Sequence, residues 1–513
     1  MTFKRLYKVY LVVTSFSSVH AASVNTPKVI DRDVIIIGGG AAGSHAAFRL
    51  QQDYNKSVIL IEKQSILGGH VDTYLDTTTT PPTPRDHGVQ LYFPYLDGLD
   101  FISRFNLTLL PGLGPRGSTI TRNIDFATGL GLPSNYTGPD PSGMTSAIIR
   151  FHDLMVSKGW DKMVEPGFWN LPPGPQIPED LLLPIGEFAK KWNVTEALPR
   201  MYESTGGGVA ARHRNFTDVL TLTFLQSFSP TWMQVFYGQA PTYHIDGGNQ
   251  LLYNAIHARL GSDNVLTNSI VSSVRRPEKE GDKRDIEVTI KTTLPNNITG
   301  NSQTVIRAKK LLLAIPPTRE NLAPFDLSPL ETDLFRRPKY GRYGTAIVTS
   351  PVLPRGYELH NTPILAVSNP NKPFINGPHI LDFSSYGNDS ELFSIGTMSG
   401  SGLSYGEFDP EKAVAVAQES LDRMVAAGTV KGAAGGKKGG DKSSRLKVLE
   451  YSDHGPGGFG VSAEEMRGGW MEKVYGLQGK RGTWYTGNAI AIDFSTQLWK
   501  MNDEVLRRML ESW

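Results

Sequence analysis

A short apolar run that leads directly into a glycine-rich turn is the feature that most constrains the fold of this chain. Residues 33–44 read Asp-Val-Ile-Ile-Ile-Gly-Gly-Gly-Ala-Ala-Gly-Ser, and helix-forming residues follow without interruption. In this spacing Gly38 permits a tight turn, Gly40 lets the backbone approach a pyrophosphate, and Gly43 lets the helix pack closely on the sheet. The pattern predicts a strand, a turn and a helix over 41–52 that together bind a dinucleotide.

The start of this helix and the strand after it complete the predicted site. The first helical turn, which contains Ala42, leaves backbone N–H groups free and carries a partial positive charge, and both favour a bound phosphate. A second β-branched run over 57–61 ends at Glu62, whose carboxylate can accept hydrogen bonds from a ribose diol. We expect Glu62 to bind the ribose rather than to be a solvated surface acid. The same fingerprint serves NAD and FAD, so it does not identify the nucleotide.

A second glycine pair follows the acidic strand end. The run Gly-Gly-His-Val-Asp-Thr-Tyr occupies 68–74. Here the chain resembles the flavin-containing amine oxidase superfamily, in which a Gly-Gly pair followed by a basic residue lies beside the cofactor. Near the other end, 483–488 is similar to the closing strand and glycine turn that cover the FAD pyrophosphate in that superfamily. The resemblance implies FAD as the cofactor, with contacts from Gly69, His70, Gly487 and Asn488.

Three motifs indicate a narrower family within this superfamily. The run 68–74, the run Asp-His-Gly-Val over 86–89, and Tyr-Thr-Gly over 485–487 before Leu498-Trp499 resemble the fungal β-cyclopiazonate dehydrogenase family. Members of that family are FAD enzymes that oxidise, and often oxidatively cyclise, natural products with prenyl-derived groups. The resemblance implies a small apolar substrate, and molecular oxygen or another electron acceptor as the second partner.

Two more segments are expected to contact the cofactor. A helix predicted from Phe494 to Leu510 would point its N-terminus, with Phe494 and Ser495, at the flavin ring, where a positive helix end would stabilise the anionic reduced flavin. The run 265–274 is typical of a strand, and in the superfamily this place crosses the adenine end of FAD near Val271. Another apolar strand is expected over 309–315, closed by two prolines that cannot continue a ladder.

These segments predict an α/β fold with a discontinuous, amine-oxidase-like Rossmann domain and an interleaved mixed α+β substrate domain. A chain of 513 residues is too long for one hydrophobic core. The Gly-, Lys- and Ala-rich stretch 426–445 indicates a flexible surface loop. The expected FAD-binding domain comprises 27–115, 236–330 and 455–513, and the expected substrate domain comprises 116–235 and 331–454.

Composition excludes several classes of function. The 52 basic residues are balanced by 50 acidic ones, which argues against a nucleic-acid partner because such a partner usually requires a dense basic face. The chain has no cysteine, so disulfides, Cys-x-x-Cys redox pairs and a cysteinyl flavin link are impossible. We predict no metal site.

The N-terminal residues predict export. Lys4, Arg5 and Lys8 precede a short apolar run over 9–13, and small residues suited to a signal peptidase follow, so residues 1–21 are expected to be a signal peptide cleaved after Ala21. No stretch reaches the roughly 20 apolar residues that a membrane span requires. Export to the endomembrane lumen or outside the cell also fits the Asn-x-Ser/Thr sequons at Asn55, Asn106, Asn135, Asn193, Asn215, Asn297 and Asn388.

No residue could be assigned as the catalytic base. Two roles are open for His70: its imidazole could attack the flavin 8α-methyl group and form a covalent tether, or it could donate a hydrogen bond to phosphate or ribityl oxygens. His87, Tyr92, Tyr243 and His244 are candidates for the pocket or a base, although a structural or exposed position for His87, and core packing for the other three, is the simpler explanation.

Three functions remain open from the sequence. The leading hypothesis is a secreted FAD oxidase or dehydrogenase that abstracts hydride from a prenylated or alkaloid-like secondary metabolite, with ring closure by an internal nucleophile. The second is a redox-neutral isomerase of polyenoic fatty acids or other polyenes, because such flavoproteins have a similar architecture. The third is a non-catalytic flavoprotein that binds or carries a ligand.

Overall fold

The computed structural model describes residues 28–205, 215–278, 284–294, 298–399, 408–431 and 445–513. The predicted signal peptide, the sequon at Asn297 and most of the predicted loop over 426–445 lie outside these residues. Within them, none of the helices combines the length and the apolar character that crossing a bilayer requires.

The first sheet is built around the predicted nucleotide-binding strand. Its strand order is β10-β11-β12-β1-β2-β9, with β19 beside β12. The core strands β12, β1, β2 and β9 run parallel, as does β19 beside β12, while β10 and β11 form an antiparallel extension. The strands span β1 Lys28–Ile37, β2 Val58–Ile61, β9 Val265–Leu266, β10 Ser269–Arg275, β11 Ile286–Leu294, β12 Ile298–Leu313 and β19 Thr483–Tyr485.

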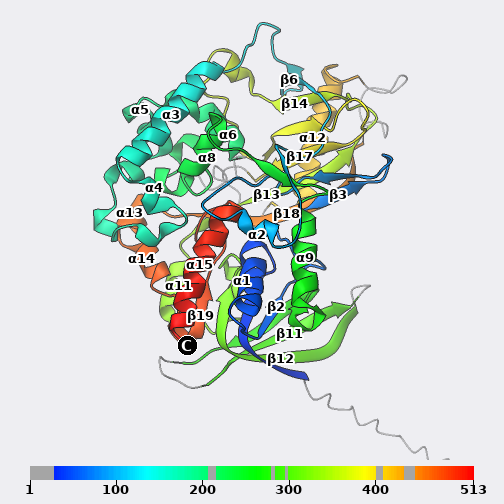
Figure 1. Cartoon of the computed structure of the whole chain (residues 1–513). Helices are drawn as coiled ribbons and strands as arrows, with labels where there is room; N and C mark the ends of the chain where they lie inside the picture. The colour runs from blue at the N-terminus through cyan, green and yellow to red at the C-terminus, as the bar shows by residue number, and fades with distance from the viewer. Residues whose placement is uncertain (1–27, 206–214, 279–283, 295–297, 400–407, 432–444) are drawn as a thin grey trace, which may run out of the picture.

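Helices cover this sheet where its strands are most apolar. The buried end of β1, Val34–Ile37, lies between β2 and β12, and α1 (Ala41–Gln52) begins directly after the glycine turn. Figure 1 shows α1 beside α15 (Ser495–Glu511) and α9 (Gln250–Leu260). The contact between α1 and α15 is fixed by hydrogen bonds from the C-terminal helix to backbone carbonyls of the first turn of α1, among them Asn502 Nδ2 to Ala42 O at 2.7 Å. Because α1 begins at Ala41 and ends at Gln52, the predicted helix 41–52 is confirmed at both ends.

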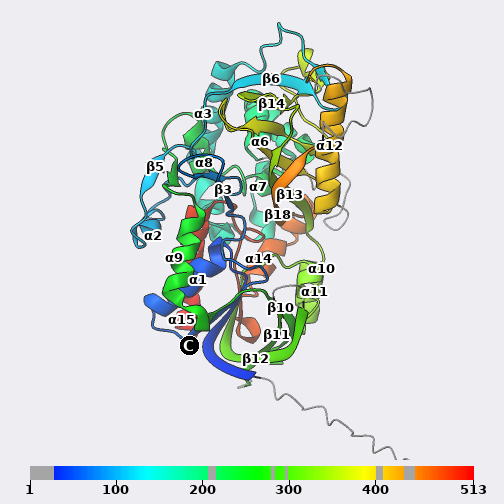
Figure 2. The same cartoon turned by 90° about the vertical axis from the view of Figure 1, so that its right-hand side faces the viewer.

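The second sheet is mixed and belongs to a separate layer (Figure 1). Its order is β18-β13-β17-β16-β14-β6-β7, with β15 beside β17. Figure 2 shows α12 (Pro410–Ala426) along one face of this sheet, where Ala417, Leu421 and Met424 pack into an apolar cluster with Phe383 and Ile395. The strands span β6 Ile120–Asp125, β7 Leu130–Gly131, β13 Lys339–Thr349, β14 Tyr357–Asn361, β15 His379–Ile380, β16 Asp382–Ser385, β17 Phe393–Met398 and β18 Lys447–Gly460.

A helical layer stands beside the second sheet in Figure 1. Phe151 and Phe188 of this layer are completely buried and join the same core as the first sheet. The main helices are α3 Pro141–Ser157, α4 Asp161–Val164, α5 Ile185–Lys191, α6 Leu198–Ser204, α7 Thr221–Phe224 and α8 Pro230–Phe236. Two further two-stranded sheets are separate from the main ones. They are β3 (Thr73–Asp76) with β4 (Thr83–Asp86), and β5 (Leu109–Pro111) with β8 (Tyr243–Ile245).

The architecture confirms the predicted Rossmann-type α/β fold with a second, mixed α and β region, and it corrects two strand predictions. The predicted strand 265–274 is two strands, because Asn268 adopts a left-handed conformation (φ 50°) between β9 and β10. The strand expected at 309–315 is the end of the much longer β12, whose first half is mostly polar in sequence and therefore lacks the apolar signal of a buried strand. The domain boundaries given by the sequence stay a prediction.

Candidate active site

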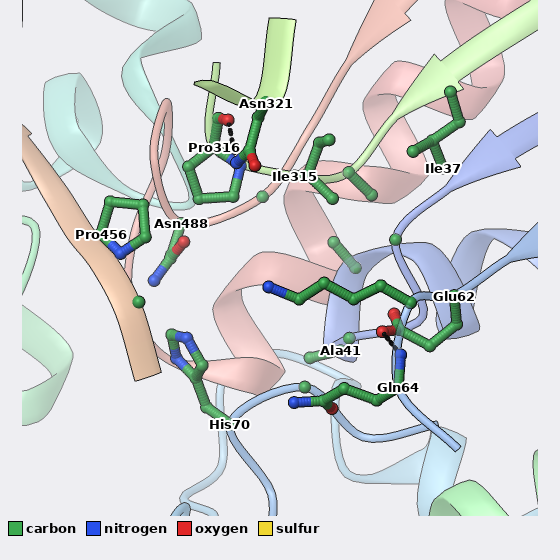
Figure 3. A pocket seen from close by; sticks show the side chains of 18 of the residues that line it. Ile37, Ala41, Glu62, Gln64, His70, Ile315, Pro316, Asn321, Pro456 and Asn488 are labelled. Carbon is green, nitrogen blue, oxygen red and sulfur yellow. Dashed lines mark hydrogen bonds between the residues drawn. The ribbon is translucent and has the colours of Figure 1, made fainter. Parts of the chain in front are cut away.

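The main candidate site is a cavity at the carboxyl ends of β1, β2 and β12, with about 1500 Å³ of empty space including its open mouth. Figure 3 shows Glu62 and Ile37 toward one side of the cavity and His70, Asn488 and Pro456 toward the other. Of the predicted cofactor contacts, those that line the cavity are Gly38, Gly40, Ala42, Glu62, Gly69, His70, Val271, Gly487, Asn488 and Ser495.

The floor of the cavity is made of two glycine segments in backbone contact. Gly40 and Gly68 form an isolated parallel bridge, and the Gly68 N–H donates to Gly39 O at 2.9 Å. A Cβ atom on Gly69 would lie only 2.8 Å from the Gly40 Cα, so no larger residue fits there without movement. Gly38 has a φ of 104°, which suits glycine and turns the chain from β1 into α1.

Gly43 supports the site without lining it. A Cβ atom at this position would lie 1.8 Å from the carbonyl oxygen of Gly38, so the glycine allows α1 to pack on the turn, as predicted. Among the described residues, no side chain caps the N-terminus of α1. The first N–H groups of the helix are therefore available to a phosphate beside Gly40 and Ala42.

The Glu62 carboxylate is held in one orientation by the backbone. Its Oε2 accepts from the Gly39 N–H at 2.6 Å. Its Oε1 accepts from the Gln64 N–H at 2.8 Å, the hydrogen bond drawn in Figure 3. The side chain is buried at 7 % exposure and faces the cavity. Each carboxylate oxygen keeps further acceptor capacity, which suits a ribose diol. The glycine floor, the uncapped helix end and this oriented acid fit the adenosine diphosphate part of FAD.

The N-terminus of α15 meets the same cavity. Asp493, Ser495 and Leu498 line it, and no described side chain caps the helix. Phe494, the N-cap residue, is not among the lining residues: its ring packs between Phe93 and Trp232, with centroid distances of 5.0 and 4.9 Å. The predicted helix 494–510 is thus present, and its positive end faces the cavity through the Ser495 turn.

A pair of histidines lies where the second sheet meets the cavity. The rings of His70 and His454 stack with centroids 4.6 Å apart, and both residues line the cavity. Burial and, to a smaller extent, the neighbouring His454 lower the pKa of His70 to about 3, so His70 is neutral at physiological pH. His454 Nε2 lies 3.4 Å from Asp72 Oδ2, and the Ser452 hydroxyl donates to the same oxygen.

Sequence reasoning missed the residues that β18 brings to the cavity, namely Asp453, His454, Gly455 and Pro456. A proline and glycines inside a strand pattern mark a close approach or an irregular edge, and that signal was present in the run His-Gly-Pro-Gly. Other lining residues that the sequence did not indicate are Lys63, Gln64, Val89, Ser269, Ile270, Glu320, Asn321, Pro324 and Phe325.

The other candidates for a catalytic base, His87, Tyr92, Tyr243 and His244, are not among the residues that line the cavity. His87 is buried with Nδ1 at 3.2 Å from the Thr345 hydroxyl. Tyr92 and Tyr243 form a short backbone bridge, and His244 Nδ1 lies 3.0 Å from the carbonyl oxygen of Gly112. These surroundings favour the packing roles that the sequence left open.

One cluster with metal-ligating chemistry lies in the second sheet. Glu358 and His360 on β14 and Asp382 on β16 offer ligand atoms that lie within 4.8 Å of one another. His360 Nε2 is 3.3 Å from Glu358 Oε1, and the hydrogen bond from His360 lowers the pKa of Glu358. Because the three residues come from two strands, no local motif indicated them.

Known proteins resemble this chain along most of its length. A family model described as an NAD(P)-binding Rossmann-like domain matches residues 36–105. The chain is 29 % identical over 494 residues to the β-cyclopiazonate dehydrogenase of Aspergillus flavus, covering 96 % of both chains. It is 30 % identical over 486 residues to the FAD-dependent oxidoreductase dpchF of Colletotrichum higginsianum, covering 92 % of both. The chain belongs to the FAD-dependent oxidoreductases. Its cofactor is therefore FAD, as the geometry of the cavity indicates.

Solved structures place this FAD-dependent oxidoreductase in the amine-oxidase-like fold. The fatty acid isomerase from P. acnes that produces CLA superposes with a TM-score of 0.66 at 17 % identity, covering 93 % of this chain and 98 % of that one. Putrescine oxidase bound to putrescine superposes with a TM-score of 0.58 at 15 % identity, covering 94 % and all of its chain. At these identities the likeness concerns the fold.

Proposed function

We propose that this FAD-dependent oxidoreductase removes hydride from an apolar, prenylated or alkaloid-like secondary metabolite, and that an internal nucleophile of the substrate then closes a ring. The observation that carries the proposal is the likeness to β-cyclopiazonate dehydrogenase along 96 % of the chain, which includes both sheets. Strand β18 supports it, since this strand both lines the FAD cavity and forms the edge of the second sheet. A substrate held by that sheet would lie next to the cofactor.

The side chains have distinct tasks in this proposal. FAD, when bound, supplies the hydride acceptor. Glu62 and the glycine floor hold its adenosine diphosphate part, and the N-terminus of α15 stabilises negative charge at the far end of the cavity. Strand β18 closes the cavity on the side of the second sheet, which excludes water from the reacting groups.

Anaerobic mixing with candidate substrates tests the proposed reaction. We expect a prenylated indole to bleach the flavin absorbance and to be recovered as an oxidised or cyclised product, whereas putrescine leaves the spectrum unchanged. A product isomeric with the substrate, formed from linoleic acid without oxygen use, would instead support the polyene isomerase. An unchanged spectrum across the panel would support the non-catalytic flavoprotein.

We propose further that FAD is bound without a covalent link. The neutral imidazole of His70, stacked on His454, is held as a hydrogen-bonding wall of the cavity. Acid precipitation is expected to release yellow FAD into the supernatant from both the wild type and His70→Ala. Colour that stays in the wild-type pellet but is released from the variant would establish the tether through His70 instead.

Export is also part of the proposal. It is supported by the N-terminal pattern and by the six described sequons, at Asn55, Asn106, Asn135, Asn193, Asn215 and Asn388, all of which have an exposed asparagine. Protein collected from the medium of a eukaryotic host is expected to start after Ala21 and to lose mass on treatment with an N-glycosidase. Protein that stays inside the cells, with an intact N-terminus and a mass unchanged by the N-glycosidase, would contradict export.

A further inference from the structure

The end of the cavity that β18 lines contains an imidazole held by a carboxylate. His454 Nε2 lies 3.4 Å from Asp72 Oδ2, and both side chains are largely buried. Burial raises the pKa of Asp72, but hydrogen bonds from His454 and Ser452 outweigh it and lower the pKa below its ordinary value. The ionised carboxylate can only accept hydrogen bonds, so Nε2 of His454 carries the proton and Nδ1 is the basic nitrogen.

The second cavity imidazole does not compete for a proton. Burial lowers the pKa of His70 to about 3. Its ring stacks on the ring of His454, and among the described residues it forms no ion pair with a carboxylate. Asp72 and Asp453 also act electrostatically on His70 and raise its pKa, but burial outweighs them, so His70 stays neutral. The ion-pair contact of Asp72 is with His454, and both histidines line the same cavity.

Other charged and titratable groups around His454 leave this pairing in place. From β13, the Tyr343 ring lies 5.1 Å from the His454 ring, and Arg342 pairs with Asp453 at 2.9 Å. Lys63 interacts electrostatically with Asp453, and His87 interacts with Asp72. Because Arg342 balances Asp453, Asp72 is the carboxylate that acts on His454 most directly.

We propose that His454, oriented by Asp72, is the proton acceptor of the oxidation. This inference rests on the proposed function. The substrate loses a hydride from a C–H bond to FAD, and it loses a proton from an adjacent O–H, N–H or C–H bond to His454 Nδ1. The electron pair of that second bond stays on the substrate and forms its new double bond. The substrate is oxidised, FAD is reduced, and the imidazolium beside Asp72 retains the proton.

A redox titration of the holoprotein tests the proposal without a substrate. If His454 takes up a proton when FAD is reduced, two electrons are accompanied by two protons, and the midpoint potential falls by about 59 mV per pH unit. In His454→Gln one proton fewer is taken up, so we expect about 30 mV per pH unit over the range from about pH 6 to pH 8. Asp72→Asn keeps the imidazole but removes the negative charge that stabilises its protonated form. We therefore expect the slope of about 59 mV per pH unit to hold over a narrower pH range in this variant.

His152 provides the matched control, since this histidine also has a neighbouring carboxylate, Asp153 at 3.2 Å, but lies on α3 away from the cavity lining. His152→Gln is expected to keep the wild-type slope. Equal slopes in the wild type and His454→Gln, at equal flavin content, would overturn the role of His454. The slopes are measured with a chemical reductant, so they do not depend on any substrate. The proposed function is tested separately and fails if no substrate bleaches the flavin. Flavin content and thermal midpoint, recorded for each variant, identify any variant that has not folded.

Discussion

Gly40→Val is expected to give a folded protein with less than about a tenth of the wild-type flavin content. A Cβ atom at Gly40 meets only the Gly69 Cα at 3.7 Å, an ordinary contact, and the backbone of Gly40 (φ −71°, ψ −170°) is extended and open to any residue. The valine methyl groups would instead enter the space where the pyrophosphate must approach the backbone. The ratio of flavin absorbance to protein absorbance measures the loss.

Two further glycine variants separate loss of binding from loss of folding. Gly131→Val, at the end of β7, places its Cβ 3.8 Å from Thr429, well away from the cavity, and should retain wild-type flavin. Gly43→Ala should lose both flavin and fold, because its Cβ would lie 1.8 Å from Gly38 O. Full flavin occupancy in Gly40→Val would contradict the assignment of the glycine turn.

Glu331→Gln is expected to lower the free energy of unfolding by about 3 kcal/mol, because it breaks a buried ion pair. Arg276 donates from Nη1 and Nη2 to the two carboxylate oxygens at 2.6 and 3.1 Å, and the Tyr485 hydroxyl donates to Oε1 at 2.6 Å. Glu331 and Arg276 are 3 % and 5 % exposed. The network ties Arg276, the residue after β10, to α11 (Pro329–Phe335) and β19, so its loss should appear as a lower urea midpoint.

The same glutamate predicts how stability depends on pH. Burial raises the pKa of Glu331, but Arg276 and the Tyr485 hydroxyl outweigh burial and lower it to about 2, against 4.5 for the ordinary group. Since the folded-state pKa is depressed, the stabilisation is present above about pH 4.5 and is lost as the pH falls toward 2. Urea midpoints measured between these values should converge for the wild type and Glu331→Gln.

A surface glutamate provides the control. Hydrogen bonds from Arg507 and then Arg508 lower the pKa of Glu504 to about 2 as well, but this side chain is 29 % exposed on α15. Solvent screens such a pair, so Glu504→Gln should cost less than about 1 kcal/mol. Equal destabilisation by the two substitutions would show that burial is not the source of the effect.

The nucleotide-binding unit could be predicted almost residue by residue because its signals are local. Glycine spacing, helix-forming residues and a terminal acid lie within one short stretch, and α1 begins and ends where the pattern placed it. Phe494 shows the limit of such reasoning: its position beside the helix start was right, but the side chain turns into the aromatic core with Phe93 and Trp232.

The histidine pair could not be predicted, because its geometry depends on contacts between distant parts of the chain. His454 reaches His70 only because β18 pairs with β13 in a sheet whose register follows from long-range packing. The cluster of Glu358, His360 and Asp382 has the same origin, since its members meet across neighbouring strands. Residue types alone gave no reason to place these groups together.

The shared position of β18 has a consequence for how long the cofactor stays bound. This strand is the edge of the second sheet and also a wall of the FAD cavity, opposite the glycine floor. FAD would therefore contact both layers, and its release would break contacts with each of them. We expect the dissociation rate of FAD to depend on how firmly β18 is held against β13, as well as on the individual hydrogen bonds of the glycine floor.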